Sequence, residues 1–505
     1  MKKLTFAICG ALLGLASAAA AAEMDRSTPE AEGVSSKAID AWIDACEREL
    51  DAMHGFVIVR HGKTIAEGWW SPFSADRTHM LYSHSKSFTS TAAGFLADEG
   101  KLDLDEPVAS IFPDKLPPNP SVKLLSLRVR DLLTMNTGMP YTDPQRKDPA
   151  GEWVKLFLAN EVKDNPGTVY RYDSCATYMV AAIVEKKTGR KLMDYLGEKL
   201  FRPIGIEKAW TTTSPQGIAC GGWGMNMTTR ELARFGQFYL QQGRWGGRQL
   251  LSKKWVNLAT SYQTSTMRSG DGDWNQGYGF QFWRCRHNCY RADGAFGQYT
   301  VVMPEQDAVV SLHAGLGPMD KELDLVWKYL LPAMKAEALL TDPAAEKALA
   351  DRCAKLKLRT SRVLHPDFNM PAPSDVLGKT YALTGGNRFK FDSVRLEAKA
   401  GGWEAVFTRP NGPEIRFPFG AEDWCEGESY FEPYSYEALG GLLGNQPLAG
   451  SGAWKDHVFS ARVYAHNTTF RFDFMFDFKT DGKLVLDVNL FGMNGGRWKL
   501  DGQIK

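Results

Sequence analysis

Two residues have the types and spacing of a nucleophile and its base, Ser83 and Lys86, and this Ser-x-x-Lys pattern occurs once in the chain. A serine hydroxyl is a poor nucleophile until a base takes its proton. A lysine can be that base only where burial or a nearby cation keeps it neutral. Phe88 and Phe95 follow with helical spacing and Gly100 with a stop signal, which predicts a helix carrying both polar side chains on one face of its first turn. The alternative is an N-cap serine followed by a surface lysine.

Acyl transfer also needs a group that carries the proton to the leaving group, and Tyr172 is our candidate. A phenol beside a lysine ammonium should ionise more easily than a free one. Tyr172 stands in the segment 165–174, just before a predicted helix over 178–188, so we expect it on the loop that enters this helix. The alternative is a tyrosine of the core. A second backbone N–H for the oxyanion, worth about 3–4 kcal/mol, usually comes from a glycine-rich strand.

The remaining elements up to about residue 340 predict an antiparallel sheet covered by helices, an α+β fold, because the order of elements is not a regular βαβ alternation. Thr228 and Glu231 form a capping box that predicts a helix start. The expected helices are 30–52, 129–135, a helix from 228 and 319–331; the expected strands are a hairpin within 55–67, then 277–283, 298–303 and 308–313.

The last third of the chain has another character. A charged helix over 342–356 is the predicted linker, and an all-β domain follows. Its clearest signal is a phenylalanine at every second position from Phe470 to Phe478, which predicts one buried face of an antiparallel sheet, folded as a barrel or sandwich. We interpret this stripe as core rather than ligand pocket, although small barrels sometimes hold a ligand.

The amino-acid composition limits the classes of function and partner that we expect. The chain has 505 residues, 44% hydrophobic and 24% charged, with net charge +1, which does not indicate nucleic acid or an anionic membrane as partner. Lys2 and Lys3 precede an apolar run and small residues, a secretory signal cleaved near Ala22. We therefore predict a signal peptide (1–22), a catalytic domain (23–340), a helical linker (341–357) and a β-rich domain (358–505), in an exported periplasmic or secreted protein without a membrane span after cleavage.

Seven of the eight cysteines follow the predicted signal, and an odd number leaves at least one thiol unpaired in a monomer. Cys285 and Cys289 are spaced for a small disulfide-closed loop. With His287 between them a metal site is conceivable, but no second ligand pair stands nearby, so we expect neither metal nor cofactor.

Several ordered segments resemble the serine β-lactamase-related family, specifically its class C-like branch of esterases, amidases and peptidases. The resemblance covers roughly residues 30–335 and excludes the C-terminal domain. The segments are Ser83–Asp105, Leu132–Gly138, Pro166–Tyr172, Gly221–Phe235 and Gly294–Tyr299.

The resemblance implies a β-lactamase or penicillin-binding-protein fold and a role for each matching residue. Ser83 would be acylated, Lys86 would activate it, and Tyr172 would act as general base or acid. The backbone N–H groups of Ser83 and Ala295, next to Gly294, would form the oxyanion hole.

Two departures from the family pattern bear on the substrate. Ser174 stands where the second motif usually has asparagine, and a serine lacks the reach of an amide. The Lys-Thr-Gly motif of true β-lactamases is not found at the third-motif stretch before Phe296, and Arg291 is the candidate to hold a substrate carboxylate in its place. We therefore expect a small ester or amide rather than an antibiotic as substrate. His84, inside the first motif, is expected to pack or hydrogen-bond rather than act.

Other readings stay open at this point. One is a D-amino-acid peptidase or carboxypeptidase, or a β-lactamase. Another is a non-enzymatic binding or sensor protein on the same fold, which the presence of both nucleophile and base disfavours. A Ser–His–Asp hydrolase is disfavoured because no Gly-x-Ser-x-Gly elbow occurs. Composition and motifs do not specify the acyl group, the leaving group or the oligomeric state.

Overall fold

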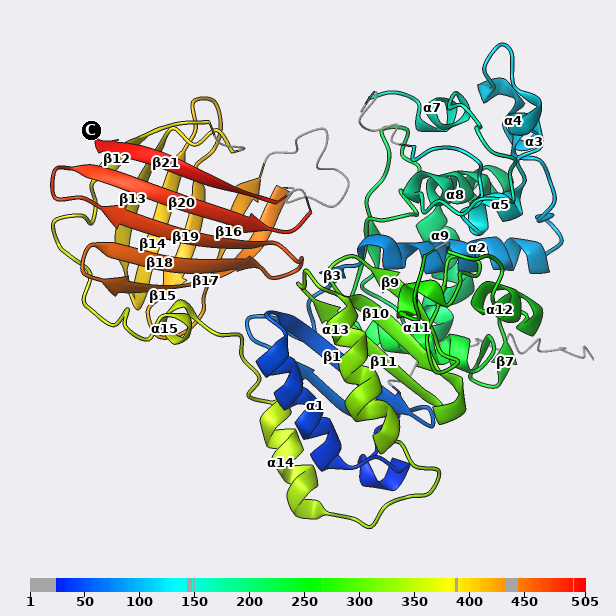
Figure 1. Cartoon of the computed structure of the whole chain (residues 1–505), viewed down its shortest axis with the longest axis horizontal. Coiled ribbons are helices and arrows are strands. Elements are labelled where there is room, and N and C mark those ends of the chain that lie inside the picture. Colours follow the sequence, from blue (N-terminus) through cyan, green and yellow to red (C-terminus); the bar gives the residue numbers. More distant parts are fainter. Residues whose placement is uncertain are drawn as a thin grey trace, which may run out of the picture.

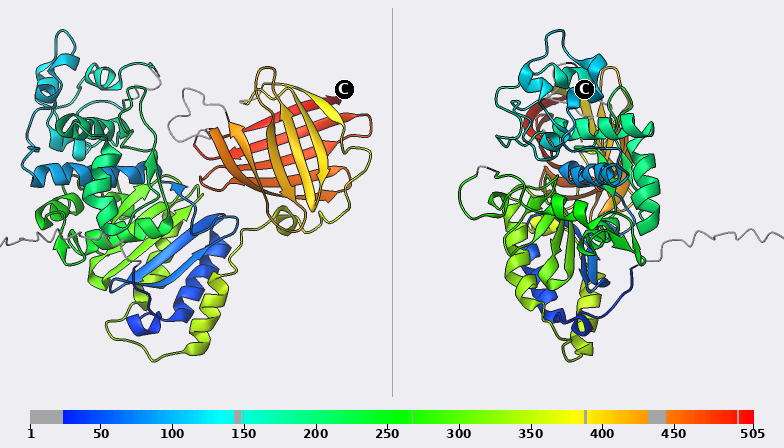
Figure 2. Two further views of the ribbon diagram at one scale, coloured as in Figure 1. Left: turned by 180° about the vertical axis from the view of Figure 1, so that it is seen from behind. Right: turned by 90° about the vertical axis from the view of Figure 1, so that its right-hand side faces the viewer.

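The structure is a computed structural model that describes residues 24–142, 148, 150–266, 268–386, 389–431, 444–493 and 495–505. The predicted signal peptide, residues 1–22, lies outside the described residues. The described chain forms a mixed first domain and a separate β-barrel at its side (Figures 1 and 2). None of its described helices is long and apolar enough to cross a membrane.

A six-stranded antiparallel sheet is the framework of the first domain, with strand order β2-β1-β11-β10-β9-β8. The strands are β1 (Met53–Arg60), β2 (Lys63–Trp69), β8 (Trp283–Arg284), β9 (Tyr290–Gly294), β10 (Gln298–Met303) and β11 (Ala308–Ala314). The predicted hairpin and the strands over 298–303 and 308–313 are confirmed. The strand expected over 277–283 is reduced to its last residue, because Gly277 and Gln281 adopt positive φ angles of 98° and 66° that interrupt a ladder.

Helices cover both faces of this sheet (Figure 1). Alternate residues of β1 point to opposite faces: Phe56 and Ile58 join the cluster under α1 (Ser36–Glu49) and α13 (Asp320–Leu325), whereas Val57 and Val59 pack toward α11 (Thr229–Leu240). The predicted capping box starts α11 as expected. The helix expected over 30–52 begins only at Ser36, and the one expected over 319–331 continues beyond α13 as a π turn, Val326–Leu330.

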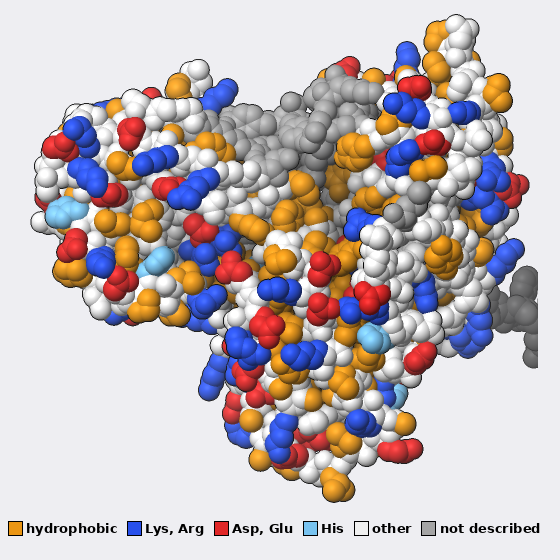
Figure 3. Space-filling model, viewed as in Figure 1, with side chains coloured by type: hydrophobic (Ala, Val, Ile, Leu, Met, Phe, Trp, Pro, Cys, Tyr) orange, Lys and Arg blue, Asp and Glu red, His pale blue; other side chains and the backbone are white. Residues whose placement is uncertain are grey.

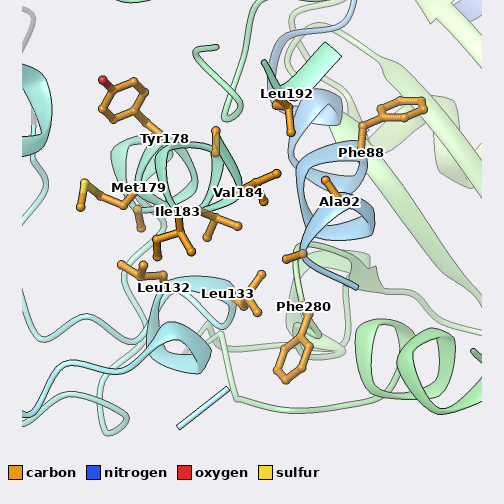
Figure 4. Close-up of a cluster of buried hydrophobic side chains, with 14 of the residues drawn as sticks. Phe88, Ala92, Leu132, Leu133, Tyr178, Met179, Ile183, Val184, Leu192 and Phe280 are labelled. Carbon is orange, nitrogen blue, oxygen red and sulfur yellow. The ribbon is translucent and has the colours of Figure 1, made fainter. Parts of the chain in front are cut away.

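A helical part of the first domain contains the segments that carry the predicted site residues. It is built around α2 (Ser85–Asp98), α5 (Val129–Leu133) and α8 (Ser174–Thr188). Phe88 and Ala92 of α2, Leu133 of α5 and Val184 of α8 belong to the cluster that fills the space between them (Figure 4). Because α2 and α8 are buried on almost every side, their apolar residues are not confined to one stripe. These two central helices position the site.

The C-terminal domain is a closed barrel. Nine strands close through a parallel contact of β15 with β17, Gly420 to Ser451, and β16 continues alongside β17. The described strands are β12 (Thr380–Thr384), β13 (Ser393–Lys399), β14 (Gly402–Thr408), β15 (Ile415–Gly420), β16 (Cys425–Phe431), β17 (Gly444–Lys455), β18 (Val458–Ala465), β19 (Arg471–Phe478), β20 (Lys483–Phe491) and β21 (Gly496–Ile504). The predicted stripe on β19, including Phe472, Phe474 and Phe476, is buried in the core of the barrel.

The segment between the domains is in contact with the first one. Helix α14 (Pro343–Cys353) packs on α1 and β2, and its Leu349 is buried there. The short helix α15 (Ser361–Leu364) then leads to the barrel and packs on β17. The domain boundaries stay predictions, but α14 packs against the first domain and is not a freely exposed linker.

The cysteines do not form the disulfide considered above. None of the seven described cysteines forms a disulfide. The backbone N–H of Cys285 donates to the carbonyl of Cys289 at 2.9 Å, so a hydrogen bond closes this turn instead of a sulfur bridge.

Candidate active site

Ser83 and Lys86 meet at the entrance to α2. Ser83 lies in a single 3-10 turn, Tyr82–His84, directly before the helix, and its side chain is partly exposed. Tyr82 has a φ of 48°, a conformation unusual for a side-chain-bearing residue, which makes the chain turn sharply just before the serine. Lys86 is buried at 1% exposure, and its Nζ lies 2.9 Å from the Oγ of Ser83. The predicted pair therefore has hydrogen-bond geometry.

The environment of Lys86 favours the neutral amine. Burial lowers the pKa of its side chain from 10.5 to about 7, although the nearby carboxylates of Asp173 and Asp293 act in the opposite direction. The Nζ also lies 2.9 Å from the Oγ of Ser174 and 2.6 Å from the carbonyl oxygen of Gly222. A neutral amine has two N–H donors and one lone pair. If Ser174 and Gly222 accept the two donors, the lone pair is left for the hydroxyl proton of Ser83.

The ring of Tyr172 lies next to the Lys86 side chain. The Nζ of Lys86 is 4.8 Å from the centre of the Tyr172 ring, and this ring stacks on Trp283 at 5.6 Å. Burial raises the pKa of the phenol well above its usual value of 10, and the hydroxyl of Ser83 lowers it only in part. The expectation that the neighbouring lysine makes this phenol easier to ionise is therefore wrong, because the desolvation of the phenol outweighs any such effect. Tyr172 carries a proton that it can donate.

Ser174 and Gly222 lie outside α2 and hold the Lys86 side chain by hydrogen bonds to its Nζ. Ser174 is the first residue of α8, which Asp173 caps by accepting a hydrogen bond from the N–H of Cys175 at 2.9 Å. A Cβ at position 222 would lie 2.3 Å from the carbonyl oxygen of Ser174, so only glycine permits this close approach. The position that usually holds asparagine in the family thus faces Lys86 here with a hydroxyl.

The turn after β9 lies against the Ser83 turn. A Cβ on Gly294 would be 2.1 Å from the carbonyl oxygen of Leu81, so the absence of a side chain lets the strand reach the nucleophile's turn. Ala295 follows and is partly exposed. Phe296, with a φ of 68°, turns the chain toward β10. Gly294 thus lies against the turn that carries Ser83, and the role of the Ala295 N–H as second oxyanion donor stays a prediction.

The barrel also touches this turn. Phe491 at the end of β20 contacts Phe296 with ring centres 5.4 Å apart, and Phe296 contacts Tyr82 at 5.3 Å. The hydroxyl of Tyr82 lies 2.6 Å from the Oγ1 of Thr469, in the β18–β19 hairpin. The backbone N–H of Met80 donates to the carbonyl of Asn467 at 3.0 Å. The C-terminal domain thus contacts the turns that carry Ser83 and Ala295.

Arg291 does not match its predicted position. Its side chain has no exposed surface, and its Nε donates to the Oδ2 of Asp293 at 2.8 Å. Its Nη1 lies 3.1 Å from the Sγ of Cys285, and the guanidinium is 4.5 Å from the centre of the Trp274 ring. A guanidinium buried and paired in this way does not present its charge to a substrate. The prediction that Arg291 holds a substrate carboxylate is corrected accordingly.

The motifs did not reveal three residues that lie near Lys86 or Tyr172. Asp173 and Asp293 lie close enough to raise its pKa, and Trp283 stacks on Tyr172. Burial raises the pKa of Asp173 to about 6. Its place next to Tyr172 in the sequence was an available signal, whereas Asp293 and Trp283 reach the site only through the sheet. His84, as expected, is structural: it is buried, and its Nε2 lies 2.8 Å from the Oγ1 of Thr300.

The comparisons agree with this fold and constellation. The model of the family named Beta-lactamase matches residues 43–331, more than half of the chain, so the chain belongs to this family. The protein is a serine hydrolase of the β-lactamase-related class.

Particular relatives are named as a hydrolase and as a peptidase. The chain is 27% identical to the 6-aminohexanoate-dimer hydrolase of Paenarthrobacter ureafaciens over 332 residues, 60% of this chain and 83% of that protein. It is 28% identical to a D-aminopeptidase of Cereibacter sphaeroides over 194 residues, 34% of this chain and 37% of that protein. The solved structure "Putative 6-aminohexanoate-dimer hydrolase from Bacillus anthracis" shares the fold, with a TM-score of 0.52 and 19% identity over 63% of this chain and 89% of that one.

Proposed function

We propose that this protein is an exported hydrolase that cleaves a small ester or amide through an acyl-enzyme on Ser83. The observation that carries the proposal is the contact of 2.9 Å between the Nζ of Lys86 and the Oγ of Ser83. It is joined by the burial that lowers the pKa of this lysine to about 7. A lysine in this state can accept a proton at physiological pH, as a general base must.

In the acylation step, the lone pair of Lys86 accepts the hydroxyl proton while the Oγ of Ser83 bonds to the substrate carbonyl carbon. The carbonyl oxygen gains the negative charge and is held by the N–H groups of Ser83 and Ala295. The tetrahedral intermediate then collapses. Tyr172 donates its phenolic proton to the departing nitrogen or oxygen and regains a proton from Lys86. The free amine or alcohol leaves, and the acyl group stays on Ser83.

In the deacylation step, a water molecule takes the place of the leaving group. The neutral amine of Lys86 accepts one proton of the water as the water oxygen attacks the acyl carbon, while Tyr172 stays protonated. The bond to Ser83 breaks, its Oγ takes the proton back, and a carboxylic acid is released. The raised pKa of Tyr172 suits the donor role, and the lowered pKa of Lys86 suits the acceptor role.

The substrate class follows from chemistry and relatives together. The names of the similar proteins are those of amide and peptide hydrolases, which supports a small amide, ester or peptide as substrate. D-amino-acid peptidase activity is the second candidate, supported by the similarity to the D-aminopeptidase over part of the chain. The buried state of Arg291 removes the cation that a β-lactam carboxylate would have met at the third motif.

The test is hydrolysis of p-nitrophenyl acetate by the protein without residues 1–22, beside the variant Ser83→Ala. We expect turnover that this variant abolishes, a mass increase of one acetyl group on intact protein during the reaction, and no cleavage of nitrocefin. Ser110→Ala is the matched control, because Ser110 is an exposed serine of the same domain whose hydroxyl donates to a backbone carbonyl. Full activity in Ser83→Ala would refute the assignment of the nucleophile.

Export has a separate test. The basic start and apolar run of the first 22 residues support a signal peptide. We expect the full-length chain, expressed in a Gram-negative host, to yield a periplasmic or secreted product whose first residue is Glu23. A cytoplasmic product that retains its first residues would contradict export.

A further inference from the structure

One exposed cation near the site has no ion-pair partner among the described residues. Arg268 lies in the segment between α12 (Lys253–Thr260) and β8, and its side chain is exposed. Its guanidinium carbon is 5.8 Å from the centre of the Trp283 ring. Within the described ranges, no carboxylate forms an ion pair with it. The guanidinium is therefore held by an aromatic face and left free to bind an anion.

The position of Trp283 links Arg268 to the reacting groups. Trp283 stacks on Tyr172 with ring centres 5.6 Å apart and an angle of 29° between the planes. Tyr172 in turn lies over the Nζ of Lys86. The order from the nucleophile outward is thus lysine, tyrosine, tryptophan and arginine. Arg268 is the exposed end of this series of contacts.

The charge of Arg268 reaches into the site. It is among the causes that lower the pKa values of Tyr170 and Asp293, against the larger effect of their burial. The other cations there are accounted for: Arg291 is paired with Asp293, and Lys86 is buried at 1% exposure. Arg268 is therefore the positive charge that an incoming anion would meet on this side.

We propose that Arg268 binds a carboxylate on the leaving group, so that the preferred substrates are esters or amides that release a hydroxy acid or an amino acid. The proposal rests on the proposed function, because Tyr172 protonates the leaving group there. The partly exposed Tyr172 and the exposed Arg268 both pack on the ring of Trp283, which is itself buried, so the phenol and the guanidinium are held near each other. A leaving group with an apolar body and a terminal carboxylate fits this order of surfaces.

The test compares two acetyl esters that give the same acyl-enzyme. One is 4-acetoxybenzoate, whose leaving group carries a carboxylate, and the other is its neutral methyl ester. The value of kcat/KM covers the steps up to acylation, and the intrinsic reactivities of the two esters are the same for every variant. A change of their kcat/KM ratio between variants therefore reports recognition of the leaving group. Wild type, Arg268→Ala, Arg268→Glu and Arg268→Lys are measured at about 0.02 M and about 0.5 M salt. Arg248→Ala is the matched control, an exposed arginine on the separate β6–β7 hairpin (Arg244–Trp245 and Arg248–Gln249).

We expect the wild-type ratio to favour the anionic ester, and the ratio to fall by about fivefold or more in Arg268→Ala, as for an ion pair worth about 1 kcal/mol at a partly exposed position. Arg268→Glu should reverse the preference, Arg268→Lys should keep part of it, and high salt should reduce it. Arg248→Ala should keep the wild-type ratio. Equal ratios in wild type and Arg268→Ala would overturn the inference and leave the nucleophile assignment standing.

Failure of the proposed function is separated from failure of this inference by a binding measurement. Titration calorimetry of the Ser83→Ala variant with 4-hydroxybenzoate, and with its methyl ester, measures recognition of the anion without any turnover. Weaker binding of the anion after the additional change Arg268→Glu supports the site even if neither ester is cleaved. Unchanged binding of the anion would overturn the site. An absence of cleavage in wild type would overturn the proposed function alone.

Discussion

The pH dependence of acylation is the sharpest consequence of the structure. Only the neutral amine of Lys86 can accept the proton of Ser83, and burial places the pKa of this amine at about 7. The value of kcat/KM for p-nitrophenyl acetate should therefore rise with pH below about 7 and level off above it, because kcat/KM reports the ionisation of the free enzyme. An ordinary exposed lysine would place this rise near pH 10 instead.

The expected size follows from the fraction of neutral lysine. With a pKa of about 7, roughly one tenth of the plateau value remains at pH 6 and roughly one hundredth at pH 5. The assay follows release of p-nitrophenol at the isosbestic wavelength of its neutral and ionised forms, where the absorbance does not depend on pH. The same reaction with Ser83→Ala at each pH gives the background to subtract, since the ester is also hydrolysed by hydroxide.

A variant distinguishes Lys86 from its acidic neighbour, since burial places the pKa of Asp173 at about 6. The negative charge of Asp173 raises the pKa of Lys86. Loss of one nearby opposite charge, taken as about 1 kcal/mol, corresponds to somewhat less than one pKa unit. Asp173→Asn should thus move the rise in activity to lower pH by up to about one unit. Circular dichroism checks that α8 keeps its cap.

Two results would refute this reasoning. A profile that stays flat from pH 5 to 9, or one that rises only near pH 10, would mean that Lys86 is not the base with a lowered pKa. A rise that disappears in Asp173→Asn would assign the titration to the carboxyl group. Lys86→Arg provides a further check, because a guanidinium stays protonated and should abolish the rise together with most of the activity.

Three substitutions test the parts that support the site and the fold. Gly222→Ala should reduce kcat/KM at least about tenfold with an unchanged circular dichroism spectrum, because its Cβ would meet the Ser174 carbonyl at 2.3 Å; wild-type kinetics would contradict the close approach. Thr228→Ala removes the hydrogen bond that caps α11 and should lower the free energy of unfolding by about 1 kcal/mol in urea titrations, whereas no change would show that the cap is dispensable. Phe474→Ala should cost the barrel about 3–5 kcal/mol by the same measurement, with the outward-facing Met475→Ala as a control of small effect; equal losses would place Phe474 outside the core.

The face of the molecule in Figure 3 agrees with the small net charge. Lys and Arg side chains alternate there with Asp and Glu, so this face carries no extended patch of one sign. A specific anion near the site is therefore recognised by a local group rather than by a long-range field.

The sequence by itself determined which residues meet at the start of α2. The Ser83 and Lys86 spacing, the helix after it and the capping box of α11 depend on neighbours within a few residues, which a linear pattern records. The alternation of Phe472, Phe474 and Phe476 likewise determined a buried strand face. This pattern did not distinguish a barrel from a sandwich. Closure of the barrel depends on the pairing of β15 with β17, which no local pattern records.

Tertiary structure alone decided the electrostatics of the site. Local spacing suggested that a lysine would ease the ionisation of Tyr172, but burial acts on both groups and reverses this, lowering the pKa of Lys86 and raising that of Tyr172. The same burial took Arg291 out of reach of a substrate by pairing it with Asp293. Desolvation depends on all the segments packed around a group, and these come together only in the folded chain, so no motif contains the information.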